Sequence, residues 1–204
     1  MTDRATLIEE LRQWIGDERV LAAIAIVPRE LFVPEPLRRH AWDNAALAIG
    51  SGQTISQPLV VARMTELLDV RPGNRLLDVG TGSGYHAAVL AALGARVWSV
   101  ERHAELSATA ARALAAAGID GVELVVGDGS GGLPEHAPYD RINVAAATPL
   151  DALEGLEAQL ADRGRLVAPL ADGEQRLVLA RRHGEHVHHR LLEPVRFVPL
   201  VRGG

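Results

Sequence analysis

From residue 75 onward, short apolar runs alternate with stretches in which apolar side chains recur every three or four positions. Runs of the first kind are typical of buried strands, and stretches of the second kind of amphipathic helices. We therefore predict strands over residues 75–79, 96–100, 123–126, 141–145 and 165–169, and helices over residues 85–93, 104–117 and 150–160. Because strands that alternate with helices form a parallel sheet covered on both faces, the pattern predicts a doubly wound α/β fold.

The chain before residue 60 has a different pattern, which predicts two helices followed by irregular structure. Asp3 and Asp17 each precede a helical pattern and are expected to cap its first turn. Pro28 ends the second helix. The following segment contains Gly50 and Gly52 and is expected to be a loop that closes over a binding site, with an ordinary surface turn as the alternative. A helix over residues 60–68 then leads into the alternating region.

The end of the chain contains three β-rich runs, at residues 177–180, 186–192 and 195–201, with no helical pattern between them. They predict a β-hairpin that completes the edge of the sheet, which then has about seven mostly parallel strands. A chain of 204 residues suits a single domain. We therefore expect residues 1–60, with the helices and a substrate or cofactor loop, and residues 61–204, the α/β domain, to form one compact unit.

Composition and charge exclude several kinds of chemistry. The chain has no cysteine and no lysine, so disulfides, thiolate metal sites and lysine Schiff bases are impossible. Its 26 acidic and 21 basic residues give a formal charge of −5, which disfavours nucleic acid as a partner. Four histidines between residues 183 and 189 lack further ligands, and we assign no metal to them. The longest early apolar run, residues 20–27, is too short to span a bilayer, so we expect a cytoplasmic protein without membrane contact.

The most informative segment joins a predicted strand to a predicted helix through Gly80, Gly82 and Gly84. Glycine permits positive φ in a tight turn and lets a ligand approach bare backbone, so this segment predicts a nucleotide-type binding loop. Glu101 follows the next strand, 21 residues after Gly80, where such folds place a carboxylate for the ribose hydroxyls. Asp128 follows the third strand. Acidic residues are therefore expected to gather at one edge of the sheet.

Two classes of ligand compete for this loop, and charge favours one of them. Gly82, Gly84 and Ala87 satisfy the spacing of a dinucleotide fingerprint. However, Asp78 lies just before the loop and would repel a diphosphate by about 4 kcal/mol per charge pair at roughly 4 Å and an effective dielectric of about 20. S-Adenosylmethionine brings an ammonium and a sulfonium, which a carboxylate attracts, so Asp78 favours this cofactor over NAD. The alternative is that Asp78 and Asp128 only cap turns or helices.

These residues and several further segments resemble the protein-L-isoaspartate O-methyltransferase family over nearly the whole chain. The glycine loop is shared by many methyltransferases, whereas the sequence GQTISQP at residues 52–58 is much more specific to this family. The segments that carry the resemblance are residues 27–34 (VPRELFVP), 49–58 (IGSGQTISQP), 77–85 (LDVGTGSGY), 127–129 (GDG) and 197–200 (FVPL).

The resemblance implies a Rossmann-like enzyme that transfers the methyl group of S-adenosylmethionine to the free carboxylate of L-isoaspartyl residues in damaged proteins or peptides, which initiates their repair. By family position, Ser56 is the catalytic residue. The cofactor-binding residues implied in the same way are Gln53, Thr54, Ile55 and Ser56 beside the cofactor, Asp78, Gly80, Thr81, Gly82, Ser83 and Gly84 at its methionine end, Glu101 at its ribose, and Asp128 and Gly129 at its adenine.

This chemistry needs few catalytic groups. A sulfonium is already a good leaving group and a carboxylate is ionised at pH 7, so no general base is required. The enzyme must align oxygen, methyl carbon and sulfur, an orientation effect worth about 7–11 kcal/mol in favourable cases. Ser56 is then expected to donate a hydrogen bond that positions the substrate carboxylate. From the residues alone, Ser56 would instead suit a turn or a helix cap, because Pro58 follows two positions later.

Four other functions stay open, one of which is a cofactor-binding module without catalysis, disfavoured by the intact segment around Ser56. A close rival is an enzyme that methylates one dedicated peptide or protein. An NAD-dependent oxidoreductase is disfavoured by Asp78 and by the segment around Ser56. A nucleic-acid methyltransferase is disfavoured by the acidic charge and by AAATP at residues 145–149, where base-methylating enzymes usually place an Asn/Asp-Pro-Pro-aromatic motif. The preferred prediction is a monomer that acts on isoaspartyl-containing proteins or peptides.

Overall fold

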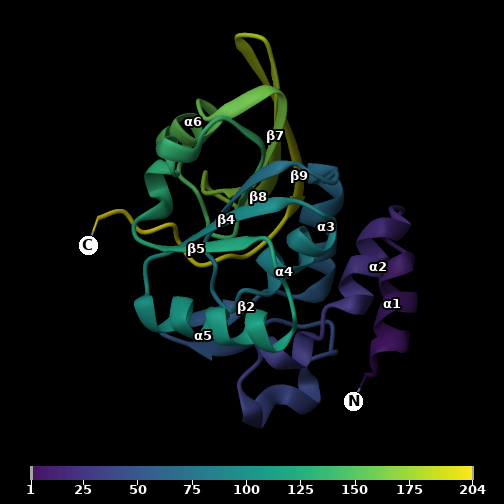
Figure 1. The fold of residues 1–204 in the computed structure, drawn as a ribbon. Coiled ribbons are helices and arrows are strands. Elements are labelled where there is room, and N and C mark those ends of the chain that lie inside the picture. The colour runs from purple at the N-terminus through teal and green to yellow at the C-terminus, as the bar shows by residue number, and fades with distance from the viewer. Residues whose placement is uncertain (1, 204) are drawn as a thin grey trace.

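A seven-stranded sheet in the order β5-β4-β3-β6-β7-β8-β9 organises the fold (Figure 1). The computed structural model describes residues 2–203. The five strands from β5 to β7 are parallel, and β8 and β9 add an antiparallel hairpin. The predicted doubly wound, mostly parallel fold of about seven strands is therefore confirmed. The strands are β3 (Arg75–Val79), β4 (Arg96–Glu101), β5 (Val122–Val126), β6 (Tyr139–Val144), β7 (Leu160–Leu170), β8 (Arg176–His183) and β9 (His186–Pro194).

Helices cover both faces of this sheet. On one face α3 and α4 pack against the strands through an apolar cluster that includes Met64, Leu90 and Leu76. On the other face α6 contributes Leu153 and Leu156 to a second cluster. Because both faces are buried, the parallel strands are apolar almost throughout, which made them readable from the sequence. The helices are α3 (Pro58–Leu68), α4 (Tyr85–Ala92), α5 (Ala104–Ala116) and α6 (Leu150–Glu157).

The first two helices, α1 (Arg4–Arg12) and α2 (Glu18–Ile26), lie outside the layer that contains α4 (Figure 1). Asp3 accepts a hydrogen bond from the Thr6 amide at 2.8 Å, and Asp17 accepts one from the Arg19 amide at 2.9 Å. Both predicted N-caps are therefore confirmed. The apolar faces of α1 and α2 join a cluster with residues of α4 and α5. None of the helices within residues 2–203 is long and apolar enough to cross a membrane.

The segment predicted to be a loop around Gly50 and Gly52 contains a small antiparallel hairpin, β1 (Leu47–Gly50) and β2 (Gln53–Ile55). Its turn uses left-handed backbone at three successive residues, with φ of 100° at Gly50, 50° at Ser51 and 71° at Gly52. Strands of three and four residues are too short to show a period, so the pattern predicted only irregular structure. We call residues 47–56 the flap.

The last predicted strand, residues 195–201, is wrong. Apart from one bridge between Ala147 and Pro199, this segment forms no strand. Pro194 and Pro199 carry no amide hydrogen, so they cannot donate to a ladder. The segment instead runs across the carboxyl ends of the strands, where the Ala147 amide donates to Val198 O at 2.8 Å and the Leu200 amide to Ala147 O at 2.9 Å. We call residues 194–201 the tail segment.

Candidate active site

A cavity of about 1000 Å³ opens at the carboxyl ends of β3, β4 and β6. The chain proceeds outward from β3 through β4 to β5 and then returns to place β6 on the other side of β3. Ligands bind at such a switch in strand order because the connections diverge there and leave a crevice. The walls of the cavity come from the flap, the glycine loop after β3, the residues after β4, and the tail segment.

The glycine loop turns tightly beneath this cavity. Gly80, Gly82 and Gly84 have φ of 91°, 54° and 86°, which are left-handed values that side chains with a Cβ rarely adopt. The Gly80 amide donates to Val100 O at 2.9 Å, which ties the loop to the end of β4. A Cβ on Gly84 would lie 3.0 Å from the Cβ of Ala110 on α5. The loop thus needs glycine both for its backbone conformation and for close packing, and it exposes Gly80 to Ser83 to the cavity.

Glu101 lies in the cavity wall, as predicted for the ribose carboxylate, and is only 6% exposed. Its Oε2 accepts a hydrogen bond from the Gly82 amide at 2.9 Å, and its Oε1 accepts one from the His103 amide at 2.9 Å. The side chain therefore joins the glycine loop to the start of α5. A carboxylate held by two backbone amides is fixed in position and keeps further lone pairs for a ligand.

Asp78 is buried behind the glycine loop and is not among the residues that line the cavity, so its expected role at the methionine end stays a prediction. Its two carboxylate oxygens accept hydrogen bonds from Ser99 Oγ and from Asn143 Nδ2, both at 2.7 Å. Burial raises the pKa of Asp78 to about 6, although both hydrogen bonds favour the charged form. Asp78 caps no turn or helix.

A polar chain continues from Asp78 to His86 in the cavity wall. Asn143 Nδ2 also donates to His86 Nδ1, at 3.1 Å, and the other ring nitrogen lies 3.1 Å from Thr65 Oγ1. Burial lowers the pKa of His86 to about 3, so its imidazole is neutral at pH 7. Reasoning from the sequence missed His86 and Asn143. The only signal for Asn143 was a polar residue inside an apolar strand, and His86 carried none.

The flap supplies the opposite wall through Gln53, Thr54, Ile55 and Ser56, all of which line the cavity as predicted. Ile55 is 3% exposed and anchors the flap in the apolar core. The Ser56 hydroxyl makes no hydrogen bond to any residue from 2 to 203, whereas its carbonyl oxygen accepts one from Arg29 at 2.7 Å. Ser56 therefore presents a hydroxyl that is available to a ligand, across from the glycine loop.

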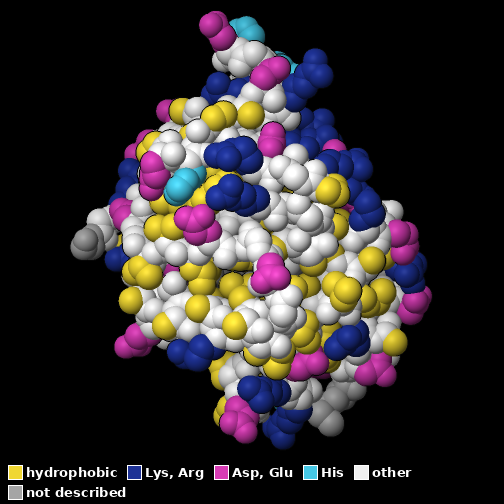
Figure 2. Space-filling view, viewed as in Figure 1, with side chains coloured by type: hydrophobic (Ala, Val, Ile, Leu, Met, Phe, Trp, Pro, Cys, Tyr) yellow, Lys and Arg dark blue, Asp and Glu magenta, His cyan; other side chains and the backbone are white. Residues whose placement is uncertain are grey.

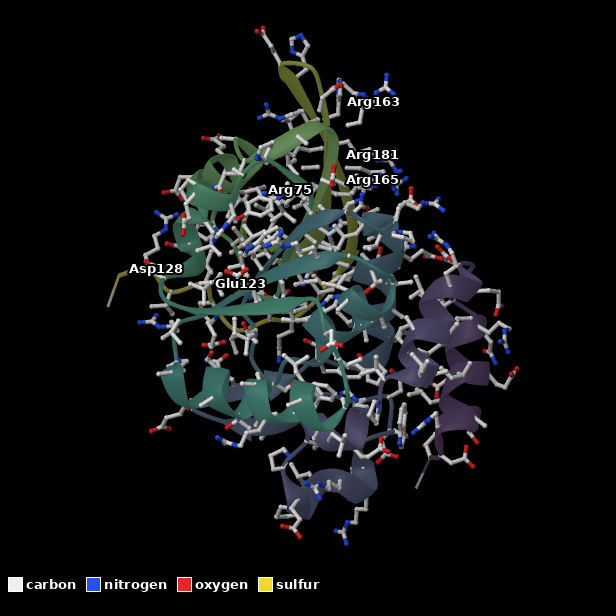
Figure 3. The ribbon with its side chains drawn as sticks, viewed as in Figure 1. Arg75, Glu123, Asp128, Arg163, Arg165 and Arg181 are labelled. Atoms are coloured by element: carbon white, nitrogen blue, oxygen red, sulfur yellow. The ribbon has the colours of Figure 1, made fainter. Side chains whose placement is uncertain are left out.

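Asp128 and Gly129 follow β5 at the far side of the cavity. Asp128 is exposed and caps a short 3-10 turn, accepting from the amides of Ser130 at 2.8 Å and Gly203 at 2.7 Å. The capping role left open for Asp128 is confirmed, and Figure 3 shows this residue beside the end of the chain. Gly129 lines the cavity. A Cβ there would lie 2.6 Å from Val100 Cγ1, so only glycine fits.

Comparison with models of protein families shows to which family this chain belongs. The model of the family described as protein-L-isoaspartate(D-aspartate) O-methyltransferase matches residues 2–204 of this chain. The chain belongs to this family. Curated relatives support the assignment over most of their length. The protein-L-isoaspartate O-methyltransferase of Methanoculleus marisnigri is 53% identical over 189 residues, which are 92% of this chain and 85% of that protein. The enzyme of the same name from Aeromonas hydrophila is 51% identical over 193 residues, 95% of this chain and 94% of that protein.

Solved structures of this family share the fold. One protein-L-isoaspartate O-methyltransferase superposes with a TM-score of 0.86 at 28% identity, and the alignment covers 99% of this chain and 66% of that one. A structure titled as a putative member of the family from Plasmodium falciparum, in complex with S-adenosyl-L-homocysteine, gives a TM-score of 0.85 at 24% identity with both chains fully covered. The seven-stranded arrangement described above is therefore the fold of this family.

Proposed function

We propose that this chain is a protein-L-isoaspartate O-methyltransferase. It transfers the methyl group of S-adenosylmethionine to the free carboxylate of isoaspartyl residues in damaged proteins or peptides. The observation that carries the proposal is the cavity that brings the free Ser56 hydroxyl across from the glycine loop and Glu101. The relatives at about half identity that bear this enzyme name support it.

The residues of the cavity fit S-adenosylmethionine. Glu101 would hold the ribose hydroxyls, because its carboxylate is fixed in the wall after β4. The bare backbone of Gly80 and Gly82 would lie along the methionine end, and Gly129 lines the part of the cavity that the adenine would occupy. The buried charge of Asp78 favours a cationic ligand over a diphosphate. When bound, this cofactor supplies a methyl group on a positively charged sulfur that leaves readily.

The acceptor is a carboxylate, which is already ionised at pH 7, so the chain need supply no general base. His86 is a poor base here because its pKa lies near 3. Ser56 donates a hydrogen bond to the acceptor carboxylate and holds one oxygen toward the methyl carbon. The cofactor would supply the methyl group to that oxygen and leave as a neutral thioether, so the product would be a methyl ester. The flap and the tail segment form walls of the cavity in which these atoms would lie.

We propose further that the enzyme is a cytoplasmic monomer with neither a nucleic-acid nor a membrane partner. The formal charge of −5 supports the absence of nucleic acid, because binding phosphates requires a basic excess. Light scattering coupled to gel filtration tests the monomer: a mass near 21.8 kDa supports it, and a mass near twice that value contradicts it.

Radiolabelled methyl transfer to a pair of peptides tests the function. The two peptides have the same sequence and differ only in one isoaspartyl or aspartyl residue. We expect label on the isoaspartyl peptide and none above background on its aspartyl twin. Label on both peptides would contradict selectivity for isoaspartate. Label on neither, with transfer restored only by one natural protein, would favour the dedicated methyltransferase instead.

A further inference from the structure

Arg29 is a buried arginine next to the flap. Its side chain is fully buried, with a relative exposure of 0%. Its Nε donates to Ala41 O at 2.8 Å and its Nη2 donates to Ser56 O at 2.7 Å. The guanidinium carbon lies 4.6 Å from the centre of the Tyr85 ring. The side chain thus contacts the peptide of Ser56 and the first residue of α4, which follows the glycine loop directly.

This cation has no ionic partner. No carboxylate within residues 2–203 forms an ion pair with it, its buried Nη1 makes no hydrogen bond of good geometry, and the group that favours its charged form is the Tyr85 hydroxyl. Burial lowers the pKa of Arg29, but a guanidinium still keeps its proton at neutral pH. Burying an unpaired charge destabilises a fold, and an apolar residue of similar volume would avoid this penalty. The arrangement therefore calls for a role other than stability.

The position of Arg29 suggests that role. Ser56 is the last residue of the flap, two positions before α3 begins. Its carbonyl group and its hydroxyl-bearing side chain are attached to the same Cα, so holding the carbonyl also restrains the hydroxyl. The guanidinium of Arg29 holds this carbonyl and also stacks on the Tyr85 ring. It therefore sets the distance between the flap and the end of the glycine loop. Phe32 packs edge-on against the same ring at 5.7 Å, so the ring itself is fixed. Arg29 does not line the cavity and can act on a ligand only through its neighbours.

We propose that Arg29 is a positioning residue that fixes the Ser56 hydroxyl relative to the methyl donor. The proposal rests on the function given above, since it assigns to Ser56 the acceptor carboxylate. Lysine at position 29 keeps the charge but cannot reach two carbonyls with a planar fork. Even small misplacement of an aligning group lowers the rate strongly, because proximity catalysis depends on near-ideal geometry.

A double-mutant cycle on methyl transfer to the isoaspartyl peptide tests the proposal. We expect Arg29→Lys to lower kcat by about tenfold or more while the Kd for S-adenosylhomocysteine stays within about twofold. In the Ser56→Ala background the same change should lower kcat by less than about twofold, because the hydroxyl that it positions is gone. Equal fold-losses in both backgrounds would overturn the proposal and leave Arg29 a purely structural residue.

Two further variants keep this test decisive. Arg29→Gln removes the buried charge and its desolvation penalty, so it should fold even where the lysine variant does not, and it should show the same non-additive loss of kcat. Arg75→Lys is the matched control. Arg75 also stacks on an aromatic ring, at 4.7 Å from Trp98, and donates to the carbonyls of Pro138 and His136, but it lies at the opposite end of β3 (Figure 3). Its kcat should stay within about twofold of wild type, and a loss equal to that of Arg29→Lys would overturn the proposal.

These outcomes separate the inference from the proposed function. If the wild-type protein fails to methylate the isoaspartyl peptide, the proposed function is wrong. If it methylates the peptide but the cycle is additive, only the role of Arg29 is wrong. If it methylates the peptide and Ser56→Ala is fully active, the activity stands but the roles of both Ser56 and Arg29 are wrong.

Discussion

At the scale of single residues, we expect the buried carboxylate of Asp78 to make cofactor binding depend on pH. Its pKa is raised to about 6 by burial, and a cation in the cavity favours the ionised form and so lowers this pKa. Binding then releases a proton below pH 6, and affinity rises with pH until it levels off above that value. We expect the Kd for S-adenosylhomocysteine to be roughly five- to tenfold weaker at pH 5 than at pH 7, measured by calorimetry.

Asp78→Asn is the control for this pH dependence, because other titratable groups also face the cavity. Glu101, His86 and His103 line it, and of these His86 ionises only near pH 3. The asparagine variant should bind more weakly at pH 7 and lose most of the pH dependence. An equal Kd at pH 5 and pH 7 in the wild-type protein would show that Asp78 does not sense the ligand.

Ser56→Ala tests the hydroxyl of the flap. The change removes one hydrogen bond to a charged acceptor, a contribution of about 1.5–3 kcal/mol, so kcat should fall on the order of 10- to 100-fold. Because the backbone of the flap is unchanged, the Kd for S-adenosylhomocysteine should stay within about twofold. Ser130→Ala, in the 3-10 turn after β5, serves as a matched control. Full activity of Ser56→Ala would remove this residue from the mechanism.

At the scale of elements, the junction between the glycine loop and α4 depends on Gly84. Alanine there is strained by the left-handed φ of 86°, and its Cβ would press against Ala110 at 3.0 Å. We expect Gly84→Ala to lower the free energy of unfolding by about 2–4 kcal/mol in urea denaturation, the sum of conformational strain and overpacking. Gly118→Ala has the strain alone, because φ is 64° and no atom lies within 4 Å. Equal losses in both variants would contradict the packing argument.

The accuracy with which an element could be predicted from the sequence depended on how much of that element is buried. Strands β3 and β4 were predicted to within one residue, because a strand buried on both faces is a short apolar run with polar ends. The β1–β2 hairpin was missed because its strands have only four and three residues, too few to show an alternating pattern of burial. The strand predicted in the tail segment was wrong. Its apolar residues pack on α3 and on the ends of the sheet strands, and no partner strand pairs with them.

At the scale of the whole molecule, arginines concentrate at the end of the sheet opposite the cavity. Arg141, Arg165 and Arg181 are direct cross-strand neighbours on β6, β7 and β8, and Figure 3 shows Arg165 and Arg181 side by side. Arginines also gather along this edge in Figure 2. Like charges opposite one another destabilise a sheet. Asp69 offsets this repulsion, since its carboxylate lies 3.2 Å from Arg165 and 2.7 Å from Arg71.

Asp69→Asn should therefore destabilise the fold. Asparagine tolerates the left-handed backbone at this position, where φ is 50°, so the change removes only the charge. We expect the free energy of unfolding to fall by about 1–3 kcal/mol at low salt, with part of the loss recovered at roughly 0.5 M NaCl. Glu123→Gln, whose exposed carboxylate lies 3.9 Å from Arg96, should change stability by less than about 0.5 kcal/mol. A loss that salt does not reduce would contradict the electrostatic account.

The candidate site was predictable where its residues are close in sequence and not where they meet through the fold. The flap residues 53–56 and the glycine loop were both found in the cavity wall. The contact between Asn143 and Asp78 spans 65 residues, and that between Arg29 and Ser56 spans 27. Neither pair has a local pattern, because each depends on which strands and loops become neighbours. The role given to Asp78 stays a prediction, and its burial was not readable from the sequence because it depends on Ser99 and Asn143, which neighbouring strands bring beside it.

The central claim is that the cavity holds a methyl donor on the glycine-loop side and an acceptor carboxylate on the flap side. A crystal structure of the protein with S-adenosylhomocysteine and an isoaspartyl peptide tests it most directly. We expect the ribose on Glu101, a carboxylate oxygen of the peptide within about 3.2 Å of Ser56 Oγ, and the sulfur directed toward that carboxylate. A peptide carboxylate held elsewhere, or a sulfur that faces away from Ser56, would contradict the account.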